Sequence, residues 1–318
     1  MPTISARRFY SFALNPDPAT VSAVLHIEHL KELFTLHGDA ARAPIRNFSI
    51  SARDFDWAHE SALMGVVNLS ADSWHRESVC LSADAAIERG NILATQGAAI
   101  IDVGAESTLA HAERVGGAAQ SSVLLPVVRE LSHAGLVVSV ETYRPDVTRA
   151  CLEAGAKVLN LTGPGRSAEM YRMVAEHSAA VIICFVEGNN VREVSDYSLA
   201  EDPIPRLHEY FAREIETATK AGVERIFIDP GMGFYYSNLQ DSSVRVRHQI
   251  TTFINSFRLR TLGWPICHAL PHAFEYFKEE VRSAEPFFAV LASLGKANLY
   301  RTHEVARVRA VLETLNAF

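Results

Sequence analysis

The sequence predicts a (β/α)8 barrel, or TIM barrel, preceded by an N-terminal extension. Its 318 residues fit one barrel of about 250 residues with an appendage. Eight short apolar runs alternate with helical stretches, and most of these runs are rich in Val and Ile without polar alternation. This pattern is typical of strands that are buried on both faces of a parallel sheet. A doubly wound open sheet is the alternative, because a strand or two is easily miscounted from a single sequence.

The apolar runs give the expected strands in chain order, and the segments between them give the helices. The eight expected strands are residues 62–68, 98–104, 135–141, 156–160, 179–185, 225–229, 264–268 and 297–300. The clearest expected helices are residues 83–96, 146–154, 203–221 and 304–315. Ser82 is suited to cap the first of these, and Pro145 suits an early position of the second.

The first 60 residues do not follow the strand–helix alternation. We expect residues 1–60 to form an extension, with a helix over residues 20–36 and a strand-like segment at residues 45–51, and residues 61–318 to form the barrel. The sequence assigns no function to the extension.

Composition and charge exclude several classes of protein. Hydrophobic residues make up 48% and charged residues 21% of the chain, which is ordinary for a globular protein, and the net charge of −7 argues against a broad nucleic-acid surface. The longest apolar runs fall far short of the roughly 20 residues that a membrane span needs. No signal-peptide pattern opens the chain, so we expect a cytoplasmic protein without membrane partners. The four cysteines form no C-x-x-C pair and are expected to be buried free thiols.

Polar residues gather where the expected strands end, which is the functional end of a barrel. Any one of them taken alone could simply cap the following helix. Because they all lie at the same end of the barrel, they instead suggest a site with hydrogen-bond acceptors on one side and cations on the other. Such a site suits a donor-rich heterocycle that carries an anion. The residues are Asn68, Asp102, Glu141, Asn160, Asp229 and His268, with Arg301 and His303 after the last strand.

The order and spacing of six motifs resemble those of the dihydropteroate synthase family, the pterin-binding barrels of folate biosynthesis. The resemblance runs from about Leu63 to the C-terminus. The motifs are MGVVNLSADSW at 64–74, IIDVGAEST at 100–108, VSVET at 138–142, AGAKVLN at 154–160, IDPGMGF at 228–234 and RTHEV at 301–305. The family condenses a hydroxymethyl-dihydropterin pyrophosphate with p-aminobenzoate and releases pyrophosphate with the assistance of magnesium.

The resemblance implies a role for each matching residue. Asn68 matches the asparagine near Mg²⁺ and pyrophosphate, and Arg301 and His303 match the pyrophosphate anchors, so these three are the expected catalytic residues. The expected pterin contacts are Asp102, Glu141, Asn160 and Asp229. The resemblance also implies Mg²⁺ as cofactor, a pterin-type ligand and a homodimer formed through late helices.

Departures from the family pattern concentrate on the acceptor side of the site. The family's Asp before Thr on the third strand is Glu141 here. Its Ser-Arg-Lys motif is absent, since residues 267–273 read Cys-His-Ala-Leu-Pro-His-Ala. A new donor for the pterin carbonyl is therefore needed, and His268, His272 and Arg192 are all candidates. The expected acceptor-side or loop residues are Ser73, Trp74, Thr108, His268 and His272.

These departures favour a transferase of this type that uses an arylamine other than p-aminobenzoate. Two alternatives stay open. A non-catalytic pterin-binding paralogue would explain the missing lysine. A folate-dependent methyltransferase on the same barrel would need the acidic pterin pocket but no pyrophosphate anchors.

Overall fold

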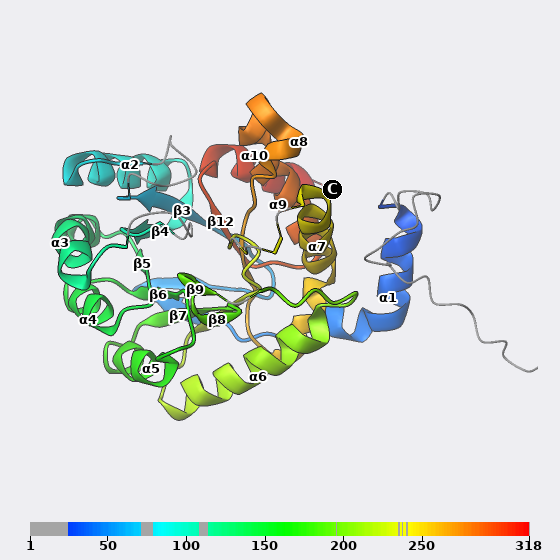
Figure 1. The fold of residues 1–318 in the computed structure, drawn as a ribbon, viewed down its shortest axis with the longest axis horizontal. Coiled ribbons are helices and arrows are strands. Elements are labelled where there is room, and N and C mark those ends of the chain that lie inside the picture. The colour runs from blue at the N-terminus through cyan, green and yellow to red at the C-terminus, as the bar shows by residue number, and fades with distance from the viewer. Residues whose placement is uncertain are drawn as a thin grey trace, which may run out of the picture.

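The structure is a closed parallel barrel, as the sequence predicts. It is a computed structural model that describes residues 25–70, 79–107, 114–194, 196–234, 236, 238–239 and 241–317. The eight-stranded sheet has the order β10-β7-β6-β5-β4-β3-β12-β11, and a parallel bridge between Ile228 and Ile266 joins its two edges. Figure 1 looks into the barrel, with the helices arranged around the strands. The open-sheet alternative is thereby excluded.

The barrel strands lie close to their expected positions. They are β3 (Ala62–Asn68), β4 (Ala98–Gly104), β5 (Val138–Thr142), β6 (Val158–Leu161), β7 (Ala180–Cys184), β10 (Ile226–Asp229), β11 (Cys267–Ala269) and β12 (Leu299–Thr302). The first two match the prediction residue for residue. The others begin one to three residues later, because the first apolar residues of each run lie in the turn before the strand. Val137 and Ala156 are examples, each buried just before its strand.

The outer helices follow the predicted order. They are α2 (Ala83–Thr95), α3 (Gly117–His133), α4 (Pro145–Glu153), α5 (Ser167–Glu176), α6 (Ile204–Lys220), α7 (Ser242–Asn255), α9 (Ala284–Leu294) and α10 (Val305–Asn316). The Ser82 hydroxyl accepts the Ala85 N–H at 3.2 Å, which confirms the expected cap. Short elements that the sequence did not predict are the ladder of β8 (Gly188–Asn190) and β9 (Glu193–Val194), the helix α8 (Phe274–Phe277), and the 3-10 segments η2 (Ser256–Leu262) and η3 (Lys278–Ser283).

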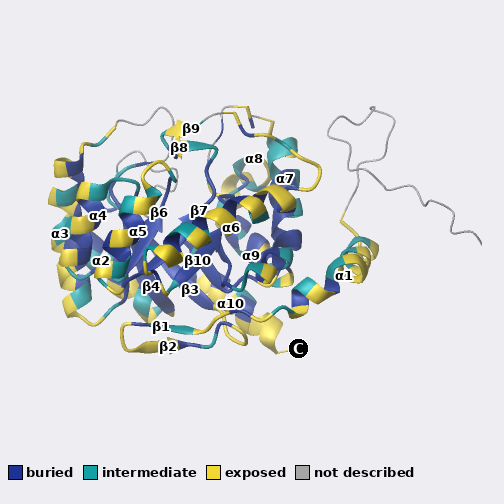
Figure 2. Ribbon diagram, turned by 90° about the horizontal axis from the view of Figure 1, so that it is seen from below, coloured by how far each residue is buried: buried dark blue, intermediate teal, exposed yellow. Residues whose placement is uncertain are grey.

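The described part of the N-terminal extension packs against the barrel. A hairpin of β1 (Phe48–Ile50) and β2 (Arg53–Phe55) lies at the end of the barrel opposite to β8 and β9, as Figure 2 shows. Trp57 is 1% exposed and meets the Phe227 ring edge-on, with centroids 5.0 Å apart. The hairpin and Trp57 therefore close the amino-terminal end of the barrel, and the opposite end is available for a site.

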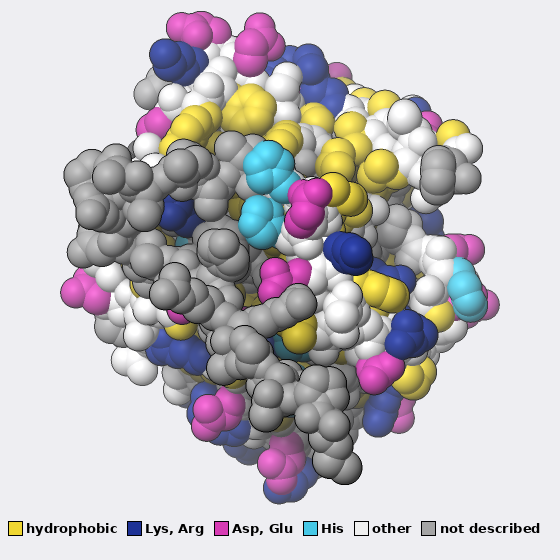
Figure 3. Space-filling view, turned by 90° about the vertical axis from the view of Figure 1, so that its right-hand side faces the viewer, with side chains coloured by type: hydrophobic (Ala, Val, Ile, Leu, Met, Phe, Trp, Pro, Cys, Tyr) yellow, Lys and Arg dark blue, Asp and Glu magenta, His cyan; other side chains and the backbone are white. Residues whose placement is uncertain are grey.

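The helix α1 (Ile27–Arg42) lies outside the barrel and packs against η2. It begins later than the expected residue 20, and residues 20–24 of that expected helix lie outside the described residues. Ile27, Phe34 and Leu36 on this helix are exposed. Figure 3 views the molecule from the α1 side and shows hydrophobic side chains among charged ones there. Within the described ranges, no helix is long and apolar enough to cross a bilayer.

Strand alternation decides which side chains enter the barrel. Near the amino-terminal end the interior is apolar, with Met64, Ile100, Val158, Phe227 and Leu299 in one cluster with the hairpin. Two residues further along the same strands, the interior turns polar. The polar members of this second set are Asp102, Asn160, Asp229 and Arg301, and its one apolar member is Val66.

Candidate active site

A cleft of about 470 Å³ opens at the carboxyl-terminal end of the barrel. Asn68, Glu141, Arg301 and His303 contribute side chains to it from the strand ends. The end of β11 and the segment after it supply another part of its wall, from Ala269 to Glu275. The structure thus brings four residues from strand ends that are distant in the sequence to one cleft.

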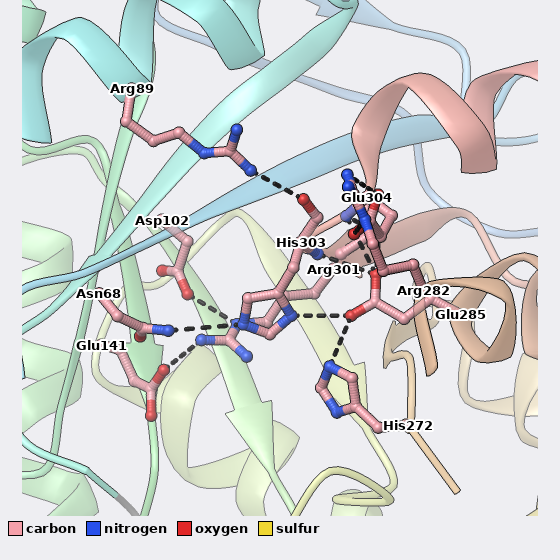
Figure 4. Close-up of polar contacts among 11 residues, drawn as sticks. Asn68, Arg89, Asp102, Glu141, His272, Arg282, Glu285, Arg301, His303 and Glu304 are labelled. Carbon is pink, nitrogen blue, oxygen red and sulfur yellow. Dashed lines mark hydrogen bonds and ion pairs between the residues drawn. The ribbon is translucent and has the colours of Figure 1, made fainter. Parts of the chain in front are cut away.

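Arg301 lies at the centre of the polar network, as Figure 4 shows. Its Nε–H donates to Asp102 Oδ2 at 2.7 Å, and its Nη2–H donates to Glu141 Oε2. The two carboxylates hold the pKa of the guanidinium above its ordinary value against the opposing effect of burial. Glu304, the acid nearest to Arg301 in the sequence, accepts from Arg282 instead, with Nε 2.6 Å from Oε1.

Asp102 and Asn160 form the floor beneath this network and are almost fully buried, at 0% and 3% exposure. Asp102 accepts the Ser139 hydroxyl at 2.6 Å and the Asn160 amide at 3.1 Å. The Asn160 carbonyl accepts the Cys184 thiol at 3.3 Å. These bonds fix the orientation of both floor residues before any ligand arrives. All four cysteines are buried free thiols, as expected.

Asp229 ends β10 on the neighbouring part of the floor. One oxygen accepts the Gly231 N–H at 2.8 Å, while burial raises the pKa of the carboxyl to about 6. Burial also raises the pKa of Glu141, although the Arg301 charge opposes this. Three carboxyl groups, Asp102, Glu141 and Asp229, therefore lie near the Arg301 cation, but only Glu141 lines the cleft, because Asp102 and Asp229 are buried beneath it. Such a site favours a ligand that donates several hydrogen bonds.

His303 stands at the rim, held between two side chains. Its Nε2 lies 3.5 Å from Asn68 Nδ2, and its Nδ1 lies 2.7 Å from Glu285 Oε1. His272 Nε2 lies 3.1 Å from the same Glu285 oxygen. Asn68 and His303 therefore lie together, as the family resemblance implies, and His272, which was expected among the acceptor-side or loop residues, lies beside His303.

Hydrogen bonds to Glu106 and Ser107 hold the loop after β4 in place. Glu106 accepts the Tyr143 hydroxyl at 2.8 Å and the Val115 N–H at 3.0 Å. Arg192, between β8 and β9, donates to the Ser107 carbonyl at 2.9 Å. This contact holds Arg192 against the loop, and Arg192 is not among the residues that line the cleft.

The prediction for His268 is wrong. We expected His268 on the acceptor side of the site, but the side chain of His268 is 0% exposed and its ring stacks on Phe253 of α7, with centroids 4.3 Å apart. Its neighbours Cys267 and Ala269 face the interior, so strand alternation directs His268 outward. Burial lowers its pKa to about 3, which keeps the ring neutral. The expected loop residues Ser73, Trp74 and Thr108 lie outside the described residues.

Sequence reasoning missed Glu285. This residue lies on α9, is 1% exposed and accepts from the backbone N–H groups of His303 and Glu304. Its signal was a carboxylate in the otherwise apolar stretch Ala-Glu-Pro-Phe-Phe-Ala-Val-Leu, where a charge must have a partner.

Comparison with known proteins agrees with this geometry. A family model described as "Pterin binding enzyme" matches residues 64–269, most of the barrel. The chain belongs to this family. Among its pterin binding relatives, the dihydropteroate synthase of Synechocystis is 26% identical over 277 residues, 83% of this chain and 92% of the relative. The dihydropteroate synthase of Mycobacterium leprae is 33% identical over 178 residues, 54% of this chain and 62% of the relative.

Solved structures show the same barrel. The dihydropteroate synthase of Xanthomonas albilineans with 4-aminobenzoic acid superposes with a TM-score of 0.71 at 26% identity, covering 85% of this chain and 97% of the other. The same enzyme with indole-2-carboxylic acid and 6-chloroguanine gives a TM-score of 0.70 at 25% identity, covering 86% and 97%. This pterin binding family member is therefore dihydropteroate synthase-like in fold and sequence.

Proposed function

We propose that this chain is a dihydropteroate synthase-like transferase that condenses a pterin-methyl pyrophosphate with an arylamine other than p-aminobenzoate. The observation that carries the proposal is the acidic floor beneath a cleft whose rim bears Asn68 and His303. The floor suits the donor edge of a pterin, and the rim suits the anion attached to it.

Asp229, Asn160 and Asp102 would hold the pterin edge. A pterin presents a ring N–H and an exocyclic NH2 side by side, which match an ionised Asp229 as a charge-assisted pair. Asp102 and Asn160 are already oriented by their mutual hydrogen bond of 3.1 Å. Little ordering of these side chains is then needed on binding, which favours affinity.

Arg301 would orient the carboxylates beneath the pterin and would also bind the pyrophosphate. Its two carboxylate partners orient the guanidinium across the barrel, with 17% of its side chain exposed toward the cleft. A bound pyrophosphate would offer this fork a second anion. His303 would add a donor at the rim, and the first N–H groups of α10, which follows directly, favour negative charge nearby.

Asn68 is the residue that would hold Mg²⁺. It supplies one amide oxygen at the cleft, which fits an ion that keeps several waters and binds mainly through substrate phosphates. Bound there, Mg²⁺ would neutralise charge on the departing pyrophosphate. The chain's own residues at the rim would orient that group for departure.

The reaction needs no strong general base to activate the acceptor amine. The amine lone pair forms the new C–N bond to the pterin methylene carbon while the C–O bond to pyrophosphate breaks, and the amine then loses a proton. Pro271, Ala273 and Phe274 line this wall, where the family has Ser-Arg-Lys. Among the described residues, Arg245 lines the cleft beside this wall but is already paired with Glu275 at 2.6 Å, so an arylamine with a substituent other than the carboxylate of p-aminobenzoate is favoured.

A pyrophosphate-release assay with the purified chain, Mg²⁺ and hydroxymethyl-dihydropterin pyrophosphate tests the proposal. We expect release to depend on a supplied arylamine and to be poor with p-aminobenzoate. Turnover at about 1 s⁻¹ or faster with p-aminobenzoate alone would contradict the altered acceptor. Tight pterin binding without turnover for any amine in a panel would identify a non-catalytic paralogue instead.

A further inference from the structure

We propose that His272, Glu285 and His303 form a zinc site at the rim of the cleft. Their three ligand atoms, His272 Nε2, Glu285 Oε1 and His303 Nδ1, all lie within 4.8 Å of one another. The three come from the segment after β11, from α9 and from the residue after β12, so only the folded barrel brings them together. Figure 4 shows both imidazoles directed at one carboxylate oxygen.

The separations suit a small ion with short bonds. The two nitrogens lie 3.1 and 2.7 Å from Glu285 Oε1. Ligands around a tetrahedral Zn²⁺ lie about 3.3 Å apart, given bonds of about 2.0–2.1 Å. Insertion of the ion therefore needs Oε1 and each nitrogen to move apart by a few tenths of an ångström, and the two nitrogens, which lie within 4.8 Å of each other, to move closer together.

The carboxylate is fixed by a second set of contacts. Glu285 Oε2 accepts the Thr302 hydroxyl and the backbone N–H groups of His303 and Glu304, the latter two at 2.9 and 3.1 Å. These bonds leave Oε1 directed at the imidazoles. Outer contacts of this kind orient ligands and support metal affinity.

Ring stacking holds His272 in place, next to the tilted ring of His303. The His272 ring stacks on Phe274 with centroids 5.2 Å apart, and the two imidazoles lie 5.1 Å apart. His272 and His303 also line the cleft, so a fourth position faces the substrate side. Two histidines, one carboxylate and an open position form a donor set that zinc prefers and that Mg²⁺, which takes oxygen ligands, does not.

The test measures binding of Zn²⁺ alone, without pterin or amine, so it stands or falls separately from the transferase proposal. The full chain is stripped with a chelator and titrated with Zn²⁺ by calorimetry, and the site is then loaded with Co²⁺ for visible absorption. We expect one Zn²⁺ per chain with a Kd below about 1 µM, d–d bands typical of a four-coordinate nitrogen and oxygen site, and no competition from millimolar Mg²⁺.

Variants assign the site. His272→Asn and Glu285→Gln should each weaken Zn²⁺ binding at least about 100-fold, since even outer-shell contacts are worth about 10- to 100-fold. His133→Asn, an exposed histidine on α3, is the matched control and should bind as wild type. Circular dichroism shows whether each variant is folded. If Glu285→Gln is unfolded, Zn²⁺ binding by His272→Asn still tests the site. Absent Zn²⁺ binding, equal affinity in His272→Asn and the control, or full competition by Mg²⁺ would overturn the proposal.

Discussion

Arg301 donates to Asp102 at 2.7 Å inside the barrel, although 199 residues separate them in the sequence. The same guanidinium bridges to Glu141, so one cation links strands β12, β4 and β5. The aspartate that the family has at this position is one methylene shorter than Glu141. The longer side chain of Glu141 reaches Arg301. This bridge couples the stability of the barrel to the electrostatics of the cleft.

Replacing Arg301 should destabilise the barrel strongly. Arg301→Gln leaves two buried carboxylates without their cation, and breaking a buried pair in this way costs about 3–5 kcal/mol. Urea denaturation at pH 7 measures the free energy of unfolding. Lys220→Gln is the control, because its partner Glu216 is exposed and such pairs contribute about 1 kcal/mol or less. A loss below 1 kcal/mol for Arg301→Gln would show that the network carries little energy.

Pterin affinity should fall in acid because of Asp229. Its pKa is raised to about 6 by burial, so the carboxyl takes up a proton as the pH falls through that value. A protonated carboxyl is a weaker acceptor for the ring N–H and the exocyclic NH2, and charged hydrogen bonds are worth about 1.5–3 kcal/mol. Calorimetry from pH 5 to 8 with a pterin measures the effect. The Asp229→Asn variant should bind the pterin weakly at every pH. If its pterin affinity instead changes with pH as that of the wild type does, Asp229 is not the group that binds the pterin.

The buried His268 should make the fold sensitive to acid. Its folded pKa is lowered to about 3, whereas the unfolded ring titrates near 6.5. The unfolded state therefore binds more protons between these values, so the stabilisation is complete above about pH 6.5 and is lost as the pH falls toward 3. His268→Leu removes this group and should flatten the pH dependence of the unfolding free energy between pH 4 and 6.5. An unchanged slope would mean that other groups dominate, and His133→Leu serves as the exposed control.

Much of the barrel could be predicted because its strands are buried on both faces and read as uninterrupted apolar runs. Ala62–Asn68 and Ala98–Gly104 match the prediction in full. The strand-like segment expected at residues 45–51 contains β1, but its partner β2 and the barrel end that the hairpin covers could not be predicted, because these strands are only three residues long.

The site was predictable where position on a strand decides it. Asp102, Asn160 and Asp229 lie on barrel strands, as the sequence predicts, and their side chains are buried beneath the cleft. The partners of Arg301 were not predictable, because its nearest acid in sequence, Glu304, is paired with Arg282. His268 was misplaced although alternation within Cys267–Ala269 already directs it outward. Glu285 gave only the signal of an isolated charge in an apolar helix.

A crystal structure of the full chain with hydroxymethyl-dihydropterin pyrophosphate tests the central claim most directly. We expect the pterin ring on the floor, within hydrogen-bond distance of Asp229 and Asn160. We also expect the pyrophosphate at the rim beside Asn68 and His303, within reach of Arg301. A pterin bound outside this cleft, or a floor that keeps all its present contacts at saturating ligand, would contradict this claim.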